Sequence, residues 1–290
     1  MHRMPASGVA SAPTRLSAEE HGRDLAGMTY AYPVLSRRAG GVSLGINLNV
    51  NNACNWACIY CQVPDLVRGG PPPVELKQLS AEFEKLLDAI ADGQFQSADP
   101  GRPAALVDVA FSGNGEPTSA PEFGAAVGIV IEALGRRDLL GRLPIRVITN
   151  GSLLHRPEVQ DALRRIGGAG GEVWFKVDRA TEAGTREVNG TAMTPDAMRT
   201  RLLACCDLAP TWIQTCWFMI DGLAPCEEET LAYVDFVAGF SARLQGVHLY
   251  GIARPSLQPA AGRLSRLDLQ SLDLLAGRLK AKGLTVNVSP

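Results

Sequence analysis

The alternation of strand-like and helix-like segments constrains the fold of this 290-residue chain more than any other feature. Apolar runs typical of strands occupy residues 42–49, 105–111, 145–149, 172–178, 212–220, 247–252 and 284–288, and helix-like runs occupy residues 80–91, 121–137, 157–166, 195–208, 227–244 and 267–282. Strict alternation predicts parallel βαβ units with right-handed crossovers. Six such units and a last strand indicate an α/β fold, either an incomplete (β/α)6 TIM-like barrel with parallel strands or a doubly wound sheet.

Residues within these strands alternate in polarity, which separates a core face from a site face. In the segment 172–178, Phe175 and Val177 share one face, whereas Lys176 and Asp178 lie on the other. Parallel strands that are buried on both sides are normally apolar throughout, so we expect the polar faces to line a cavity. Active sites of such folds gather at the carboxyl ends of the strands. A buried structural ion pair between Lys176 and Asp178 is the alternative.

Three cysteines, Cys54, Cys58 and Cys61, follow the first strand with the spacing C-x3-C-x2-C. Thiolates are soft ligands that suit iron–sulfur clusters and zinc. A [4Fe–4S] cluster normally takes four cysteines, so a loop with three leaves one iron free to hold a small molecule. A zinc site needs a fourth ligand, and the nearest histidines, His21 and His155, are not at a zinc-like spacing. We expect a [4Fe–4S] cluster, with zinc or purely structural cysteines as the alternatives.

The pattern C-x3-C-x-φ-C, with the aromatic Tyr60 before the last cysteine, resembles the signature of the radical S-adenosylmethionine (radical SAM) enzymes. The wider segment, Cys-Asn-x-x-Cys-Ile-Tyr-Cys-Gln preceded by Asn-Leu-Asn, is similar to that of wyosine-synthase-like and molybdenum-cofactor-synthase-like members. The resemblance spans residues 42–256 and favours the open barrel over the doubly wound sheet. It implies that Cys54, Cys58 and Cys61 hold the cluster and that S-adenosyl-L-methionine (SAM) is the second cofactor.

A loop with the sequence Ser-Gly-Asn-Gly-Glu-Pro-Thr follows the second strand at residues 112–118. Glycines let the backbone approach a ligand closely, but this loop lacks the third glycine of a Rossmann fingerprint. The family carries a Gly-Gly-Glu-type element here, which binds the amino group of SAM. Because Gly113 is followed by Asn114, the matching pair is Gly115 and Glu116, and Glu116 is the expected acceptor of that ammonium. A plain tight turn is the alternative.

Further SAM contacts are expected at the ends of the other strands. The resemblance implies that Asn150 lies near the ribose or methionine part, that Tyr60 lies beside the adenine, and that Arg254 pairs with the SAM carboxylate or with substrate. The alternatives are a turn-forming Asn-Gly pair, packing behind the cluster and a surface arginine. The candidate cofactor-binding residues are Tyr60, Gly113, Gly115, Glu116, Asn150, Lys176, Asp178, Gln214 and Arg254.

The resemblance also implies a reaction. A reduced [4Fe–4S] cluster cleaves SAM to methionine and a 5′-deoxyadenosyl radical, which abstracts a hydrogen atom from a substrate that the sequence does not identify. A low-potential electron donor such as flavodoxin or ferredoxin is implied as a partner. Two alternatives stay open, namely an iron–sulfur electron-transfer or regulatory protein without SAM chemistry, and a zinc-dependent RNA-binding module.

Composition bears on partners, location and domains. With 28 basic and 30 acidic residues and no long basic tract, the chain favours a small-molecule or peptide substrate over nucleic acid. No apolar segment is long enough to span a bilayer and no signal core is present, which predicts a cytoplasmic protein without a membrane partner. The polar, aperiodic residues 1–28 predict a loose N-terminal arm, and residues 29–290 predict one radical SAM core domain.

Four cysteines lie outside the motif, at Cys205, Cys206, Cys216 and Cys226. An odd total of seven, two of them adjacent, does not indicate a disulfide framework. Cysteine is often buried, so structural roles are expected for most of them. Cys226, in a predicted loop, is the candidate for a reactive thiol.

Overall fold

The structure is a computed structural model that describes residues 14–16, 27–36, 38–97 and 105–290. Most of the predicted arm, residues 1–28, lies outside the described residues, so the arm stays a prediction. Within it, the short strand β1 (Thr14–Leu16) pairs in parallel with β6 (Phe95–Ser97), and Leu16 is buried. This short piece is therefore attached to the rest of the chain.

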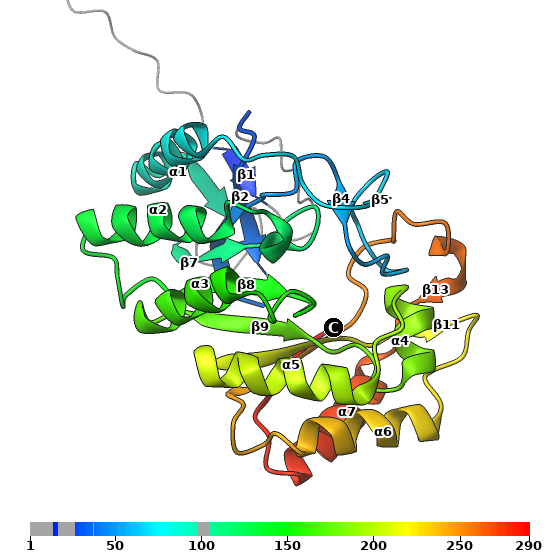
Figure 1. The fold of residues 1–290 in the computed structure, drawn as a ribbon. Coiled ribbons are helices and arrows are strands. Elements are labelled where there is room, and N and C mark those ends of the chain that lie inside the picture. The colour runs from blue at the N-terminus through cyan, green and yellow to red at the C-terminus, as the bar shows by residue number, and fades with distance from the viewer. Residues whose placement is uncertain (1–13, 17–26, 37, 98–104) are drawn as a thin grey trace, which may run out of the picture.

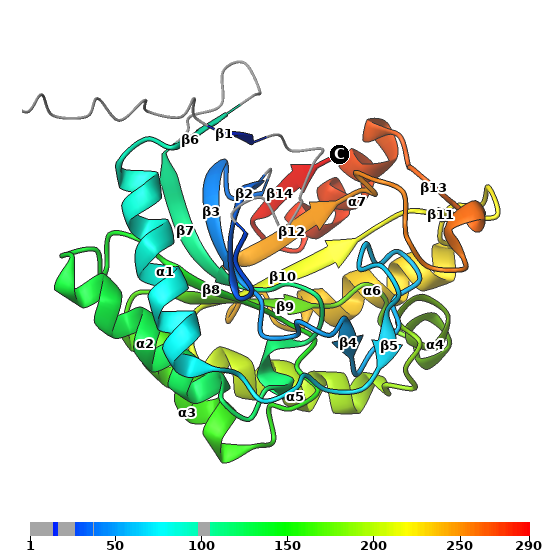
Figure 2. The same ribbon diagram turned by 90° about the horizontal axis from the view of Figure 1, so that it is seen from above.

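An eight-stranded sheet forms the centre of the molecule and curls into part of a barrel (Figures 1 and 2). All neighbouring strands are parallel except β2 and β3, which are antiparallel. The fold class expected from the sequence, an incomplete TIM-like barrel, is confirmed. In spatial order the strands are β14 (Val286–Ser289), β12 (Gly246–Tyr250), β10 (Thr211–Cys216), β9 (Glu172–Lys176), β8 (Ile145–Thr149), β7 (Leu106–Phe111), β3 (Gly41–Ile46) and β2 (Ala31–Ser36).

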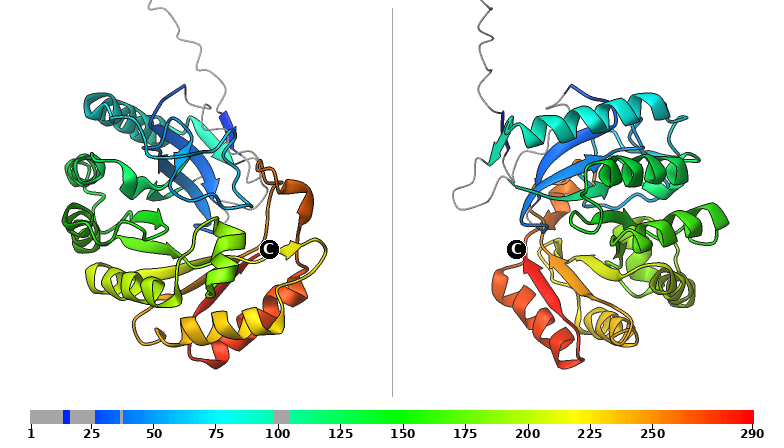
Figure 3. Two further views of the ribbon diagram at one scale, coloured as in Figure 1. Left: turned by 45° about the vertical axis from the view of Figure 1, so that its right-hand side comes forward. Right: turned by 90° about the vertical axis from the view of Figure 1, so that its left-hand side faces the viewer.

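Helices cover the outer, convex face of this sheet and leave its concave face as the lumen (Figure 3). Six of the helices follow the strands β3, β7, β8, β9, β10 and β12 in turn, as the alternation predicted, and α4 is an addition. The helices are α1 (Leu76–Ala91), α2 (Phe123–Arg136), α3 (Pro157–Gly168), α4 (Glu182–Asn189), α5 (Pro195–Leu208), α6 (Glu227–Ala238) and α7 (Leu269–Ala281). Smaller elements are the 3-10 turns η1 (Pro117–Ser119) and η2 (Ala261–Arg263) and the strand pairs β4 (Ala53–Cys54) with β5 (Val67–Arg68) and β11 (Met219–Ile220) with β13 (Leu264–Ser265).

Strand β2 and helix α4 are among the elements that were not predicted from the sequence. Strand β2 contains Pro33, which has no backbone N–H to donate. Such a residue is tolerated because β2 lies at the edge of the sheet, where one side of the strand needs no partner. Helix α4 has only eight residues, but its ends carry clear signals. The Thr181 side chain accepts a hydrogen bond from the Gly184 N–H at 3.0 Å, and Gly190 ends the helix with φ of 62°.

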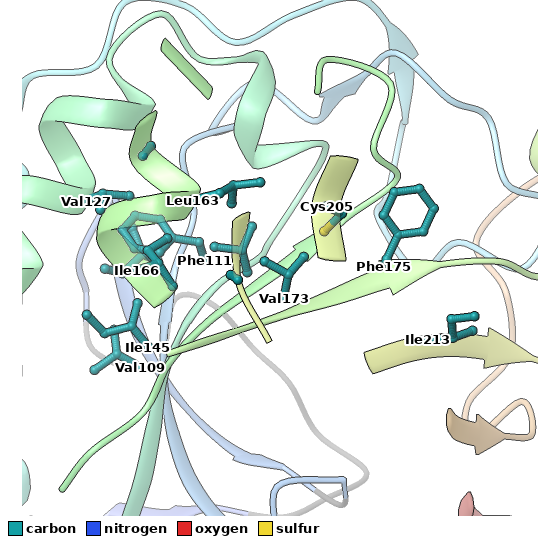
Figure 4. Packing of buried hydrophobic residues seen from close by; sticks show 14 of the residues in the cluster. Val109, Phe111, Val127, Ile145, Leu163, Ile166, Val173, Phe175, Cys205 and Ile213 are labelled. Carbon is teal, nitrogen blue, oxygen red and sulfur yellow. The ribbon is translucent and has the colours of Figure 1, made fainter. Parts of the chain in front are cut away.

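The core lies between the outer face of the sheet and the helices. Figure 4 shows side chains of β7, β8 and β9, among them Phe111, Ile145 and Val173, packed against Leu163 and Ile166 of α3. Each of these five side chains has no exposed surface. This packing removes large apolar areas from water and supplies the main stabilisation of the barrel.

The polar faces of the strands turn inward, as their alternation predicted. Ser43, Lys176 and Gln214 line the lumen, whereas their strand neighbours Leu44 and Phe175 belong to the core. No helix within the described ranges is both long enough and apolar enough to cross a membrane.

All seven cysteines are free thiols. Cys205 is buried in the core, Cys206 is half-buried and Cys216 is buried beside Val188 and Phe218. Cys226 is exposed and precedes α6. The predicted structural roles agree with the burial of Cys205 and Cys216.

Candidate active site

A cavity of about 320 Å³ occupies the lumen, and its lining includes residues that follow the carboxyl ends of the strands. It brings together Cys54, Cys58 and Cys61 with most of the candidates named from the sequence. Those that line it are Tyr60, Gly113, Gly115, Glu116, Asn150, Lys176, Gln214 and Arg254. Asp178 is not among the lining residues. We call the end that holds the cysteines the rim, and the part around Lys176, Gln214 and Tyr250 the deep half.

The cysteine loop starts at β4 and returns through β5. The three cysteines are half-buried. Burial raises the pKa of the Cys54 thiol to about 11 and that of the Cys58 thiol to about 12, and Lys176 opposes the shift at Cys58. Because metals bind thiolates, loading a metal here must displace protons.

Helix α4 holds the cysteine loop from the side, and Figure 2 shows it close to β4 and β5. The Ala57 N–H donates to the Asn189 carbonyl at 3.0 Å, and the Ile59 N–H donates to the Val188 carbonyl at 2.9 Å. The Asn189 side-chain amide donates to Cys58 Sγ at 3.3 Å. The end of α4 therefore fixes both the backbone of the loop and one of its thiols.

Asp178 supports this arrangement from beneath. Its Oδ2 accepts hydrogen bonds from the Tyr60 hydroxyl at 2.5 Å and from the Asn189 amide at 2.7 Å. Its Oδ1 accepts from the Cys216 N–H at 2.8 Å. Lys176 Nζ lies 4.0 Å from Oδ2. The carboxylate thus orients Tyr60 and Asn189, and the prediction that it contacts the cofactor directly stays a prediction.

Glu116 is buried and joins the ends of β7 and β8. Its Oε1 accepts hydrogen bonds from the N–H and hydroxyl of Thr118, at 3.2 and 2.6 Å, and from the Thr149 hydroxyl at 2.6 Å. Its Oε2 accepts from the Asn150 N–H at 2.7 Å. Burial raises the pKa of Glu116, and these hydrogen bonds oppose the shift. A carboxylate oxygen has two lone pairs, so Oε2 can accept one more donor from the cavity.

Gly113 and Gly115 are required by close packing. Gly113 has φ of 131°, and a Cβ there would meet the Asn47 side chain at 2.4 Å. A Cβ on Gly115 would lie 2.2 Å from the Ala53 carbonyl oxygen. Any larger residue would push the 112–118 loop away from the start of the cysteine loop.

Asn150 and Arg254 complete the rim. The Asn150 amide donates to Asn55 Oδ1 at 2.8 Å, and its own Oδ1 accepts from the Ser152 N–H at 2.9 Å. The Arg254 carbonyl accepts from the Gln62 side chain at 3.0 Å, which ties the loop after β12 to the cysteine motif. SAM contacts by these residues and by Tyr60 stay predictions.

Lys176 and Gln214 lie deeper. They are in register on the neighbouring strands β9 and β10. Lys176 Nζ lies 3.5 Å from the Tyr250 hydroxyl and 5.0 Å from the centre of the Tyr60 ring. Burial alone would lower the pKa of Lys176, but Asp178 and the neighbouring groups raise it above its usual value. The lysine therefore brings a positive charge into the lumen.

The donor set fits an iron–sulfur cluster in its chemistry. Within the described ranges, no three Cys, His, Asp or Glu side chains surround one point as the ligands of a single ion would. Cys54, Cys58 and Cys61 all line the same cavity. A four-iron cluster accepts such an arrangement because each thiolate binds a different iron atom.

Sequence reasoning missed two residues that shape the site. Asn189 gave only a helix-end signal, the Asn-Gly pair at residues 189–190. Arg38 lies after β2, and its guanidinium lies 4.7 Å from the centre of the Tyr250 ring, across the lumen. No local pattern marks either contact, because both join segments that are distant in the sequence.

Known structures share this architecture. A radical SAM methyltransferase from Sphaerobacter thermophilus matches 89% of this chain and 68% of its own length, with a TM-score of 0.55 and 14% identity. The [FeFe]-hydrogenase maturase HydG from Carboxydothermus hydrogenoformans matches 86% of this chain and 53% of its own, with a TM-score of 0.51 and 12% identity. The chain shares the fold of these two radical SAM enzymes. At these identities the likeness concerns the fold alone.

Sequence relatives of this chain have a higher identity to it, but only over part of their length. A UPF0026 protein of Helicobacter pylori is 32% identical over 136 residues, which cover 46% of this chain and 38% of the relative. A UPF0026 protein of Methanocaldococcus jannaschii is 31% identical over 163 residues, which cover 56% and 44%. The chain thus spans less than half the length of these curated relatives. No protein-family model matches it.

Proposed function

We propose that this chain is a radical SAM enzyme that binds one [4Fe–4S] cluster through Cys54, Cys58 and Cys61 and reductively cleaves SAM beside it. The observation that carries the proposal is the placement of three thiols of one short loop at the mouth of the lumen in a radical SAM fold. When bound, the cluster and SAM supply a 5′-deoxyadenosyl radical for hydrogen abstraction.

The side chains of the rim have defined tasks in this proposal. Glu116, with its remaining lone pair at Oε2, receives the SAM ammonium. Tyr60, fixed by Asp178, presents its ring to the cavity. Arg254 binds the SAM carboxylate or the substrate. The curled sheet encloses the reacting atoms and limits side reactions with water.

Partners and location follow from the same chemistry. A low-potential flavodoxin or ferredoxin supplies the electron, and a small molecule or peptide is the substrate rather than nucleic acid, since the chain has no excess of basic residues. A cytoplasmic location suits an oxygen-sensitive cluster.

The test is anaerobic reconstitution with iron and sulfide, followed by assay of 5′-deoxyadenosine after reduction in the presence of SAM. The wild-type chain should form a brown four-iron chromophore and release 5′-deoxyadenosine, and Cys58→Ala should lose both. Cys226→Ala, which removes an exposed thiol outside the cavity, is the matched control and should keep both.

Cys216 needs its own variant because it is the fourth cysteine that lines the cavity. Its side chain packs against the apolar residues Val188, Phe218 and Ile252, so the Cys216→Ala protein should still bind the [4Fe–4S] cluster. Loss of the cluster in this variant would mean four protein ligands and would refute the proposal. A cluster without measurable SAM binding would favour the electron-transfer alternative, and zinc in place of iron would favour the zinc alternative.

A further inference from the structure

We propose that the deep half of the cavity binds an anionic group of the substrate, a carboxylate or a phosphate. That the ligand is the substrate rests on the proposed function, whereas the anion site itself is defined by side chains of the lumen. The residues that form it are Lys176, Gln214, Tyr250 and Arg38, all of which line the cavity.

Gln214 and Lys176 provide the first observation. Gln214 has 1% of its surface exposed, and within the described ranges its Nε2 has no hydrogen-bond partner. A buried amide donor without a partner is costly, so its presence in a cavity indicates a ligand that supplies an acceptor. Lys176 is its direct neighbour in the register of β9 and β10. Two adjacent strands therefore present a cation and an open donor side by side.

Asp178, the carboxylate next to Lys176, does not accept a hydrogen bond from its ammonium group. Asp178 Oδ2 is 4.0 Å from Nζ, beyond hydrogen-bond distance, and already accepts from Tyr60 and Asn189. The hydroxyl of Tyr250 lies 3.5 Å from Nζ. An ammonium has three donors, so Lys176 keeps donor capacity toward the cavity.

Arg38 adds a second cation from the opposite wall. Its guanidinium lies 4.7 Å from the centre of the Tyr250 ring and 5.6 Å from that of Trp174. Both distances are typical of cation–π contacts, and a guanidinium carries five N–H donors in its plane. The Tyr250 side chain thus lies next to both cations.

The carboxylates of the deep half are bonded to an arginine and to two tryptophans. Arg146 pairs with Asp108 and, at 2.7 Å, with Glu172. Glu172 also accepts hydrogen bonds from the indoles of Trp174 and Trp212. Asp108 keeps one acceptor, because its Oδ1 has no hydrogen-bond partner within the described ranges. A ligand that carries an anionic group and a nearby hydroxyl or ammonium would satisfy both the open donors and this acceptor.

The experiment is calorimetric titration of inorganic phosphate, and separately of acetate, into the cluster-loaded protein with and without saturating SAM. We expect one of the two anions to bind more tightly and its binding to persist when SAM is present. Gln214→Glu, which is nearly isosteric but adds a negative charge, should weaken that binding about tenfold to a hundredfold. Lys176→Met should do the same, and Lys77→Met, on the exposed side of α1, should not.

Three results would overturn the inference. These are the absence of binding by either anion, unchanged binding in both cavity variants, and loss of anion binding when SAM is added. The last result would assign Lys176 and Gln214 to the cofactor, as the sequence alone suggested. Failure of SAM to bind would count against the proposed function instead, because the titrations without SAM still test the anion site.

Discussion

The rim and the deep half of the cavity differ in how their polar side chains are used. At the rim, Glu116, Asn150 and Asp178 are buried and bonded to other parts of the protein. In the deep half, Gln214 keeps an open donor within the described ranges and Lys176 keeps donor capacity. The hydrogen bonds of these three buried residues therefore tie the cysteine end of the cavity to the protein, whereas the deep half contains open donors.

The difference teaches what each part is built to do. A network whose members are all satisfied is rigid, which suits a loop whose three thiols must hold fixed positions. Open buried donors are costly in an empty site and become favourable only when a ligand supplies acceptors. The rim is organised around the cysteine loop, and the deep half around a group that the chain does not itself contain.

The largest effect should come from breaking the rim network at its centre. Asp178→Asn removes the negative charge beside Lys176 and places an amide against the donors of Tyr60 and Asn189. Loss of one partner of a buried pair typically costs about 3–5 kcal/mol. We expect the free energy of unfolding, measured by urea denaturation, to fall by about that amount.

Two controls give this result its meaning. Asp207→Asn, which breaks an exposed ion pair with Arg243, should cost less than about 1 kcal/mol. Combining Asp178→Asn with Lys176→Met should recover part of the lost stability, because the cation is then no longer uncompensated. An Asp178→Asn protein as stable as wild type would show that the rim does not depend on this carboxylate.

The floor below the deep half gives a pH-dependent prediction. His248 lies between Trp174 and Trp212, with ring centres 4.4 and 4.5 Å apart from its own. Burial and the nearby Arg38 lower its pKa to about 4. The unfolded chain then takes up the proton first, so the stabilisation is complete above about pH 6.5 and is lost as the pH falls toward about 4. The loss should approach about 3 kcal/mol.

His248→Phe keeps an aromatic ring between the two indoles and removes the titrating group. Urea denaturation at about pH 7.5 and about pH 4.5 should show a smaller decrease in stability for the variant than for wild type, by about 2–3 kcal/mol. An equal decrease in both proteins would mean that other groups cause the acid sensitivity and that His248 accepts its proton without cost.

The barrel and the cysteine loop could be predicted from the sequence because both follow from local patterns, the alternation of strands and helices and the spacing of three cysteines. The alternation of strand and helix gave six βα units, and the polar face of β9 correctly placed Lys176 in the lumen. The same pattern gave Asp178 the same direction, and its carboxylate lies 4.0 Å from Lys176 Nζ, although Asp178 is not among the residues that line the cavity. Asp178 lies two residues beyond the end of β9, where the strand geometry has ended, and its side chain bonds to Tyr60 and Asn189.

The contacts that give the site its shape could not be predicted in this way. Asn189 and Cys58 are 131 positions apart, and neither has a neighbour that signals the other. The Glu116 prediction came from a motif, which identified the residue but not its hydrogen bonds to Thr118 and Thr149. Such bonds depend on how the ends of separate strands meet, and that is settled only when the sheet has curled.

The smallest effect should come from the hydrogen bond between Asn189, at the end of α4, and the Cys58 thiol. Asn189→Leu keeps the size of the side chain but removes the N–H that reaches Cys58 Sγ at 3.3 Å. A hydrogen bond to a ligand sulfur favours the reduced cluster, so its loss should lower the reduction potential by on the order of 20–60 mV, the equivalent of one net hydrogen bond. An anaerobic redox titration followed by electron paramagnetic resonance measures the shift. Asn287→Leu, on the exposed face of β14, controls for the substitution itself. A loss of stability with an unchanged potential would show that Asn189 positions the loop through Asp178 and leaves the thiol untouched.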